Sequence, residues 1–300
     1  MPVIPANLDR TKNWRRTETI TGWGFILPYL ILFVLFRFGP IIEGLFFSLT
    51  RWNLIGSSTF VGFKNYTSLL KDPFFLISFR NSLYFVVLVA PALIVIGLAL
   101  AILVNNPFLK GRKIGRTLIF APYAVMSTVV GVIWNWIYDK NFGILNYYLS
   151  FLKIGPIAWL TDEHTAMLAV AITTLWWTIG YNMVLFLAGL QEIPTELYEA
   201  AIVDGAGSWD SFRRITLPLL KPTTYVVITL TLINTFQVFD QIYVMTGGGP
   251  GTSTLTLIQY MYSQAFQNYN LGYGAAIAYA TFIVLLLLTG ILQLLIKREA

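Results

Sequence analysis

Residues 81–104 read NSLYFVVLVAPALIVIGLALAILV and contain no charged side chain. An α-helix rises about 1.5 Å per residue, so a stretch of this length crosses the roughly 30 Å hydrocarbon core of a bilayer. Further apolar stretches of at least about 20 residues occupy residues 22–48, 117–138, 165–190, 223–245 and 272–296. The short segments of alternating polarity that a membrane β-barrel requires do not occur. The sequence therefore predicts an all-α integral membrane protein with six transmembrane helices.

The composition of the 300 residues supports this class. Hydrophobic residues make up 56 % of the chain and charged residues 11 %, whereas soluble proteins contain about 25 % charged residues. This composition excludes a soluble globule, and its hydrophobicity excludes a disordered chain. The absence of Cys excludes a disulfide scaffold and thiol chemistry, and the single His leaves little for a transition-metal site. We expect neither a catalytic centre nor a metal site in this chain.

The net charge is +6, and the positions of the Lys and Arg residues decide what this excess means. The side of the predicted spans that is richer in basic residues holds Arg10, Lys12, Arg15, Arg16, Lys110, Arg112, Lys113, Arg116, Arg213, Arg214, Lys221, Lys297 and Arg298. Cytoplasmic loops are enriched in Lys and Arg, so we expect this side and both termini to be cytoplasmic. The excess therefore indicates orientation in a lipid bilayer rather than nucleic-acid binding. We expect an uncleaved first span, a cytoplasmic tail at residues 1–19 and a single transmembrane domain at residues 20–300.

The cytoplasmic loop at residues 191–222 carries an unusual pattern. From residue 193 to residue 218 it reads IPTELYEAAIVDGAGSWDSFRRITLP. One apolar face of a short helix is predicted from the spacing of Leu197, Tyr198, Ala201 and Ile202. Gly205 and Gly207 are expected to end that helix, and Ser208 to cap a second one. Pro218 and Pro222 are expected to break the chain before the fifth span. Such an element either lies in a groove on a partner protein or rests on lipid headgroups as a connector.

This loop resembles the EAA loop of ATP-binding-cassette (ABC) importer permeases. Glu199-Ala-Ala201 is followed after three residues by Gly205 and after nine more by Ile215-x-Leu217-Pro218. Other segments are similar to the carbohydrate branch of that family, which includes maltose-type and glycerol-phosphate-type permeases; they lie at residues 62–66, 116–123, 204–206, 239–240 and 246–250. The resemblance implies a type I importer permease with a coupling helix that contacts an ATPase. Its coupling residues would be Glu199, Ala200, Ala201, Asp204, Gly205, Ile215, Leu217 and Pro218.

The same resemblance implies partners and a location. A second homologous permease would complete a heterodimer, two ABC ATPases would bind ATP and Mg²⁺, and an extracytoplasmic binding protein would deliver solute at a prokaryotic plasma membrane. The chain itself has no G-x-x-x-x-G-K-[ST] sequence with which to hold nucleotide phosphates, so we expect no bound cofactor and no enzymatic activity. The glycines before Pro250 predict a turn with unusual backbone angles, which is a candidate contact for the binding protein.

Polar and aromatic residues recur at helical spacing inside three spans. In the fifth span Thr231, Asn234, Thr235 and Val238 share one face, which Gln241 extends and Gln237 borders. In the fourth span the same spacing is repeated by Thr174, Trp177, Thr178 and Tyr181. A comparable stripe in the third span comprises Tyr123, Ser127, Val130 and Trp134. Aromatic faces stack on sugar rings, and amides and hydroxyls pair with sugar hydroxyls. The alternative is that these stripes are helix–helix contacts, because small polar residues commonly join membrane helices.

In maltose-type permeases the solute is held by residues of these three helices. The resemblance places the corresponding positions at Tyr123, Trp177, Thr178, Tyr181, Thr231, Thr235 and Val238, although the residue types at Trp177, Thr231, Thr235 and Val238 differ from the family pattern. With the spacing argument, the predicted solute path comprises Tyr123, Trp177, Thr178, Tyr181, Thr231, Asn234, Thr235, Gln237 and Val238. These stripes contain no Lys or Arg, which favours a neutral sugar or polyol.

Three charged residues lie within the apolar stretches. Asp240 is expected to point away from the Thr231–Thr235 face and to pair across helices rather than to contact solute. Arg37 and Glu43 are expected to pair with other helices or with the second permease. The leading function is therefore a permease subunit of an ATP-driven importer that moves a sugar or related polyol from a binding protein into the cytoplasm. The alternative is an ion-coupled secondary transporter that uses membrane acids such as Glu43 or Asp240.

Overall fold

The computed structural model describes residues 8–53 and 56–297, and they form a largely helical membrane protein. Within these residues five helical stretches are long and apolar enough to cross a membrane, and one bent pair of helices is a candidate for a sixth. The five run over Glu18–Ser48, Pro73–Asn105, Ala166–Gln191, Ser208–Met245 and Leu271–Leu294. The all-α membrane fold expected from the sequence is confirmed.

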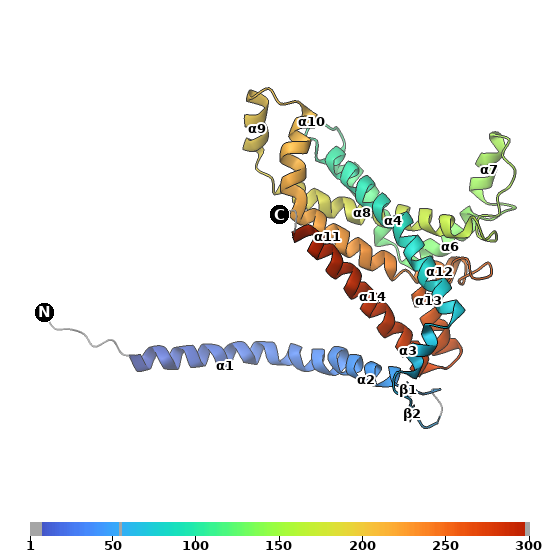
Figure 1. The fold of residues 1–300 in the computed structure, drawn as a ribbon. Coiled ribbons are helices and arrows are strands. Elements are labelled where there is room, and N and C mark those ends of the chain that lie inside the picture. The colour runs from blue at the N-terminus through green and yellow to red at the C-terminus, as the bar shows by residue number, and fades with distance from the viewer. Residues whose placement is uncertain (1–7, 54–55, 298–300) are drawn as a thin grey trace.

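The N-terminal span is a long arm that leaves the rest of the molecule (Figure 1). It consists of α1 (Leu8–Phe33), the π-helical turn η1 (Val34–Phe38) and α2 (Gly39–Ser48). Residues 1–7 of the predicted tail lie outside the described residues, whereas residues 8–19 are already helical. Apolar side chains from Ile20 to Phe46 are exposed along the arm. Lipid or another subunit must therefore cover this surface.

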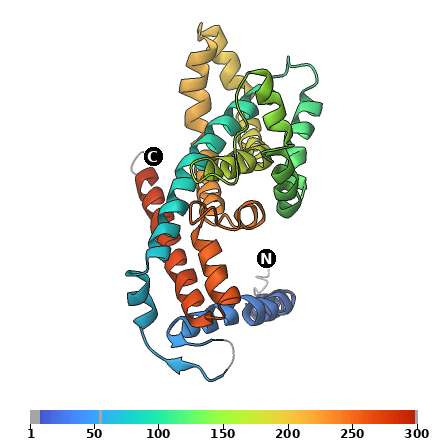
Figure 2. The same cartoon turned by 90° about the vertical axis from the view of Figure 1, so that its right-hand side faces the viewer.

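Short elements join the arm to the second span at one end of the molecule. Strands β1 (Thr50–Arg51) and β2 (Thr59–Phe60) pair antiparallel, and α3 (Lys64–Leu69) follows. Figure 2 shows these elements at the end opposite to α9 (Thr195–Val203).

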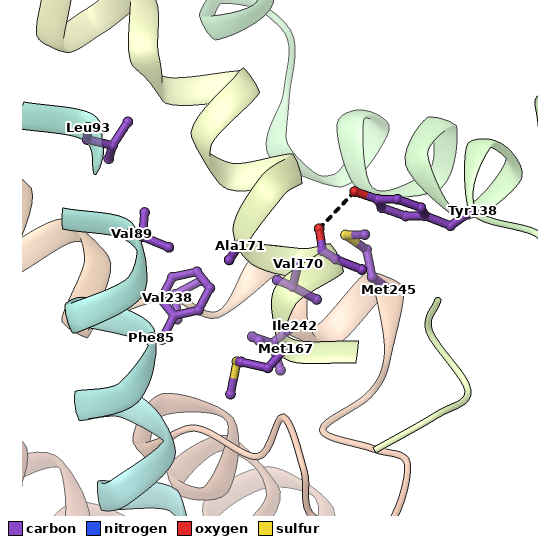
Figure 3. Close-up of a cluster of buried hydrophobic side chains, with 11 residues drawn as sticks. Phe85, Val89, Leu93, Tyr138, Met167, Val170, Ala171, Val238, Ile242 and Met245 are labelled. Atoms are coloured by element: carbon purple, nitrogen blue, oxygen red, sulfur yellow. Dashed lines mark hydrogen bonds between the residues drawn. The ribbon is translucent and has the colours of Figure 1, made fainter. Parts of the chain in front are cut away.

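Four long helices make the bundle, and they are drawn together in Figure 1. They are α4 (Pro73–Asn105), α8 (Ala166–Gln191), α11 (Leu217–Phe236) and α14 (Leu271–Lys297). Helix α4 packs along α8 and against α11, and α14 contacts α2 and α11. A buried cluster holds α4 to α8 and to α12 (Asp240–Met245) through Phe85, Met167 and Ile242 (Figure 3). The same close-up shows the Tyr138 hydroxyl donating to the carbonyl oxygen of Ala169 over 3.1 Å.

The third predicted span is bent rather than straight. It consists of α5 (Arg112–Phe120), the 3-10 turn η2 (Ala121–Ala124) and α6 (Ser127–Ile137), and the two parts meet at 97°. Val125 and Met126 have extended backbone angles, with ψ of 140° and 137°, which interrupts the helical hydrogen bonds. The prediction of one helical stripe across residues 117–138 is therefore wrong.

The fifth span begins earlier than predicted, and it is interrupted at residues 237–239 before it ends at Met245. After α9, α10 (Ser208–Ser211) continues through the π-helical turn η3 (Phe212–Thr216) directly into α11. Pro222 lies inside α11 and Pro218 near its start, so the expected break at these prolines is wrong. Both prolines are exposed, and a membrane helix tolerates Pro where the freed backbone group finds another partner. Gly207 is the N-cap of α10 and Ser208 is already its first helical residue, so the predicted cap at Ser208 is also wrong.

The remaining elements lie in the long connections of the chain. They are α7 (Ile144–Phe151), α13 (Leu257–Tyr262) and the π-helical turn η4 (Ser263–Gln267). Gly247 and Gly248 have φ of +62° and +95°, which confirms the turn with unusual backbone angles expected before Pro250.

Candidate functional site

A cavity of about 310 Å³ opens among α4, η2, α8, α11 and α12. All nine residues of the predicted solute path line it. Residues outside that prediction also line it, namely Leu93, Thr174, Asn182, Phe239, Asp240 and Gln241. The prediction omits Asn182, although helical spacing could have found it, because it continues the i, i+4 series of Thr174 and Thr178. The stripes therefore converge in space, while their role in carrying solute stays a prediction.

One side of the cavity is aromatic. The rings of Tyr123 and Tyr181 stack with centroids 4.9 Å apart and planes 21° apart, and the centroid of Trp177 lies 5.7 Å from that of Tyr123. The bend in the third span makes this possible, because it places η2 against α8. The indole Nε1 of Trp177 donates to the carbonyl oxygen of Val125 over 3.0 Å. Trp177, which lines the cavity, therefore also stabilises the non-helical backbone at the bend of the third span.

The cavity is also lined by polar groups from α8 and α11, and these groups are of two kinds. Some hydroxyls are used inside the protein: Thr231 donates to Oδ1 of Asn182 over 2.8 Å, and Thr235 donates to the carbonyl oxygen of Thr231 over 2.7 Å. These three side chains are buried and join or stiffen helices, as the helix-contact alternative predicts. Asn234 and Gln237 are instead exposed at the cavity, where their amides can pair with a bound hydroxyl.

A break between α11 and α12 changes the place of Asp240. The helix ends at Phe236, and Phe239 has φ of −139° and ψ of −59°, so helical periodicity does not extend to residue 240. Asp240 lines the cavity, and the expectation that it points away from this face is wrong. Its predicted pairing across helices is confirmed, because the hydroxyl of Ser127 on α6 donates to Oδ2 of Asp240 over 2.6 Å. The carboxylate thus belongs both to a helix contact and to the cavity wall.

The third-span stripe separates at the bend. Tyr123 faces the cavity, whereas Val130 is buried and Trp134 packs against the cluster of Figure 3. Ser127 is not among the lining residues, and it hydrogen-bonds to Asp240, which is. Of this stripe, Tyr123 alone lines the cavity.

The loop that resembles the EAA motif stands at the far end of α8 and α11 (Figure 1). Helix α9 is tied to η3 by a 2.9 Å hydrogen bond between the hydroxyls of Tyr198 and Thr216. Gly205 has φ of +79°, a left-handed conformation that favours glycine, and it ends α9 as predicted. The remaining predicted coupling residues divide by exposure: Ala201 and Ile215 are half-buried, and Glu199, Ala200, Asp204, Leu217 and Pro218 are exposed.

The tip of this loop presents apolar side chains outward. Ile202, Val203 and Trp209 are 69 %, 86 % and 70 % exposed. The predicted apolar face of α9 is therefore divided, because Tyr198 and Ala201 turn toward the protein while Ile202 turns away. A group of exposed apolar residues beside acidic ones is typical of a surface that contacts a partner.

Arg37 and Glu43 both lie exposed on the N-terminal arm. Within the described residues, neither forms a salt bridge. Pairing with another helix of this chain is thus not observed, and pairing with a second permease stays a prediction.

Comparisons with known proteins place the chain among transport proteins. Residues 93–299 match the family described as binding-protein-dependent transport system inner membrane component. The chain is 37 % identical over 285 residues to the trehalose/maltose transport system permease protein of Thermococcus litoralis, covering 93 % of this chain and 94 % of the relative. It is 37 % identical over 269 residues to the sn-glycerol-3-phosphate transport system permease protein of Agrobacterium fabrum, covering 88 % and 90 %.

A solved structure has the same fold. The chain superposes with a TM-score of 0.84 on a chain of a bacterial ABC transporter involved in the import of the acidic polysaccharide alginate. The superposition covers 96 % of this chain and 99 % of the other, with 23 % sequence identity. At that identity the likeness concerns the fold alone.

Proposed function

The chain belongs to the family of inner membrane components of binding-protein-dependent transport systems, and we propose that the solute it carries is a sugar or a related polyol. It is a multi-pass permease subunit of an ABC importer and is not itself an enzyme. Family membership favours ATP-driven import over the ion-coupled alternative, because the family depends on a binding protein. Relatives are named for trehalose and maltose and for sn-glycerol 3-phosphate, which supports a polyhydroxyl solute.

The observation that carries this proposal is the chemistry of the cavity. The Tyr123–Tyr181 stack presents an aromatic face, and Asn234 and Gln237 present amides to the same cavity. A pyranose has apolar C–H faces and a rim of hydroxyls, so it can stack on the rings and hydrogen-bond to the amides at once. The volume of about 310 Å³ lies at the lower end of small-molecule sites, and fits a single sugar unit better than a long chain.

We also propose that the loop around α9 contacts one of two ATPases that bind ATP and Mg²⁺, and that it passes the conformational change of the ATPase to α11. A cleft of the ATPase would receive the exposed side chains of Glu199, Ile202 and Val203. The hydrogen bond between Tyr198 and Thr216 would then pass movement of α9 to α11. Helix α11 lines the cavity, so movement at η3 can reach the solute through one continuous helix. This gives the coupling a defined structural element between two sites.

The orientation follows from the charge distribution. We propose that the α9 end and both termini are cytoplasmic in a prokaryotic plasma membrane. The turn at Gly247 and Gly248 would then face outward, where a binding protein delivers solute. A second homologous permease would cover the exposed apolar surface of the N-terminal arm together with lipid.

The proposal is tested with the complete importer in proteoliposomes, together with its binding protein. A thermal-shift panel of maltose, trehalose, glycerol and sn-glycerol 3-phosphate on the binding protein identifies the solute, and its uptake is then measured with and without ATP. We expect uptake that requires ATP and the binding protein. Uptake by this chain alone, driven by an ion gradient, would establish the secondary-transporter alternative instead.

A further inference from the structure

We propose that Asp240 and Gln241 hold a pair of neighbouring hydroxyls of the solute, and that Asp240 selects neutral solutes against anionic ones. This inference rests on the proposed sugar or polyol import and adds the charge class of the solute. The named relatives leave that class open, because trehalose and maltose are neutral whereas sn-glycerol 3-phosphate is an anion.

The first observation is the single charge at the cavity. Among the described residues that line the cavity, Asp240 alone is charged, and the others are apolar, aromatic, hydroxyl or amide residues. Ser127 is the donor to this carboxylate within the described residues, and it bonds Oδ2. A carboxylate has about four acceptor positions, so Oδ1 and part of Oδ2 remain for a ligand. Asp240 is exposed and lines the cavity, so its carboxylate is not buried between α6 and α12.

The second observation is an independent one at the next residue. Gln241 is 4 % exposed and lines the same cavity, yet its Nε2 has no hydrogen-bond partner in the part of the chain that the structure describes. Burying an amide donor without a partner is unfavourable by about 1–3 kcal/mol. No hydrogen bond to a described residue fixes the carboxamide, so its orientation is free to change when a ligand enters the cavity and offers the donor a partner. A solute hydroxyl would satisfy it there.

Together the two side chains match a vicinal diol. The Asp240 carboxylate accepts from both hydroxyls, and the Gln241 amide donates to one of their oxygens. Both residues lie in the first turn of α12, which begins after the break at residues 237–239, and both line the cavity. The aromatic side formed by Tyr123 and Trp177 then receives the ring of the solute.

The same carboxylate opposes an anion. A phosphate or carboxylate group in the cavity would lie near Asp240 with no Lys or Arg among the lining residues to balance it. Repulsion between like charges strengthens as the surroundings exclude water, as they do in the interior of a membrane protein. A neutral polyol donates hydrogen bonds to Asp240, whereas an anionic group cannot donate to this carboxylate and is repelled by its charge.

The first test is the thermal-shift panel on the cognate binding protein. We expect maltose, trehalose or glycerol to raise its melting temperature and sn-glycerol 3-phosphate to leave it unchanged. A shift with sn-glycerol 3-phosphate only would overturn the charge selection while leaving polyol import intact. If no member of the panel changes the melting temperature of the binding protein, the result would contradict the proposed sugar or polyol import. It would then also contradict the inference about Asp240, which rests on that function.

The second test separates solute binding from helix contact. Asp240→Asn keeps the shape and loses the charge, and we expect ATP-driven uptake of the neutral solute to fall about tenfold or more, as loss of a hydrogen bond to a charged group implies. Gln241→Met should lower uptake about fivefold. Ser127→Ala removes this one hydrogen bond between α6 and α12 but keeps the carboxylate, and the loss of uptake should stay under about fivefold.

The comparison between these variants shows whether Asp240 binds solute or only stabilises the packing of α6 against α12. Equal losses in Ser127→Ala and Asp240→Asn would mean that the pair only joins α6 to α12, and would overturn the inference. Basal ATPase activity and the elution volume of each purified complex show that the variant has assembled. An Asp240→Asn importer that assembles and transports at the wild-type rate would also overturn it.

Discussion

The Thr231 hydroxyl on α11 donates to Oδ1 of Asn182 on α8 over 2.8 Å, and both side chains are more than nine-tenths buried. This bond joins the two helices that supply most of the cavity wall. It lies one helical turn from Thr235 and next to Tyr181, so it fixes the spacing between the polar and aromatic sides. A cavity built from two helices depends on such a cross-link.

Thr231→Val tests this bond. Valine has the shape of threonine, but the buried Oδ1 of Asn182 would lose its donor at a cost of about 1–3 kcal/mol. We expect a lower melting temperature of the purified complex. The double variant Thr231→Val with Asn182→Leu should recover part of the loss, because replacing both partners by apolar groups is nearly neutral.

Thr289→Val is the control at a half-buried threonine whose hydrogen bonds stay within one helix. Thr289 donates to the carbonyl oxygen of Leu285 within its own helix α14, so its removal breaks no link between helices. A melting temperature that falls equally in Thr231→Val and Thr289→Val would show that the cross-link between α8 and α11 adds no stability.

A close backbone contact places Tyr123 beside Tyr181. A Cβ atom at Gly180 on α8 would lie 2.3 Å from the carbonyl oxygen of Ile119 and 2.7 Å from Cα of Phe120. Because both are backbone atoms, Gly180→Ala forces α5 and η2 away from α8. We expect a destabilisation of about 1–3 kcal/mol, a lower melting temperature, and reduced solute uptake because the aromatic stack opens.

Gly115 supplies the comparison on the other helix of this contact. A Cβ atom there meets nothing within 4 Å, so Gly115→Ala should leave stability and uptake unchanged or slightly raise stability. Normal uptake in a stable Gly180→Ala complex would contradict the view that this contact positions Tyr123.

Helical spacing predicts the members of the cavity well. Thr231, Asn234 and Thr235 lie on one face of an uninterrupted helix, and the regular part of α11 preserves that face. The same holds for Trp177, Thr178 and Tyr181 on α8. Where the helix is regular, the residues that helical spacing places on one face are the residues that line the cavity.

The errors fall where the backbone departs from that regularity. Extending the period of α11 across residues 237–239 misplaces Asp240, because the helix is broken there. Extending the third span across the 97° bend at Val125 misplaces Ser127 in the same way. The bend at Val125 depends in part on a contact distant in sequence, because Trp177 donates to the carbonyl oxygen of Val125.

The turn after α9 gives a prediction about coupling. Gly205 has φ of +79°, and a Cβ atom added there would have no neighbour within 4 Å, so the change introduces backbone strain but no clash. A left-handed conformation costs a residue with a Cβ about 1–2 kcal/mol, which corresponds to roughly 5- to 30-fold in the population of the turn. We expect Gly205→Ala to reduce ATP-driven uptake and leave the amount of assembled complex unchanged.

Two further variants separate strain from side-chain bulk. Gly207 lies two residues away with φ of −77° and equally open space, so Gly207→Ala should transport normally. Gly205→Asn should retain more uptake than Gly205→Ala, because Asn adopts left-handed angles more readily. Equal uptake in the three variants would contradict a need for this backbone conformation.

The bond between Tyr198 and Thr216 is the structural link from α9 to the start of the cavity-lining helix. Tyr198→Phe and Thr216→Val each remove it while keeping the volume of the side chain, and one neutral hydrogen bond contributes about 0.5–1.5 kcal/mol. If α9 moves α11 through this contact, either variant should lower the number of solute molecules imported per ATP hydrolysed, while basal ATPase activity stays normal. The double variant should be no worse than either single one, because both remove the same bond. Import per ATP that stays at the wild-type value in both single variants would show that α9 moves α11 through its packing alone.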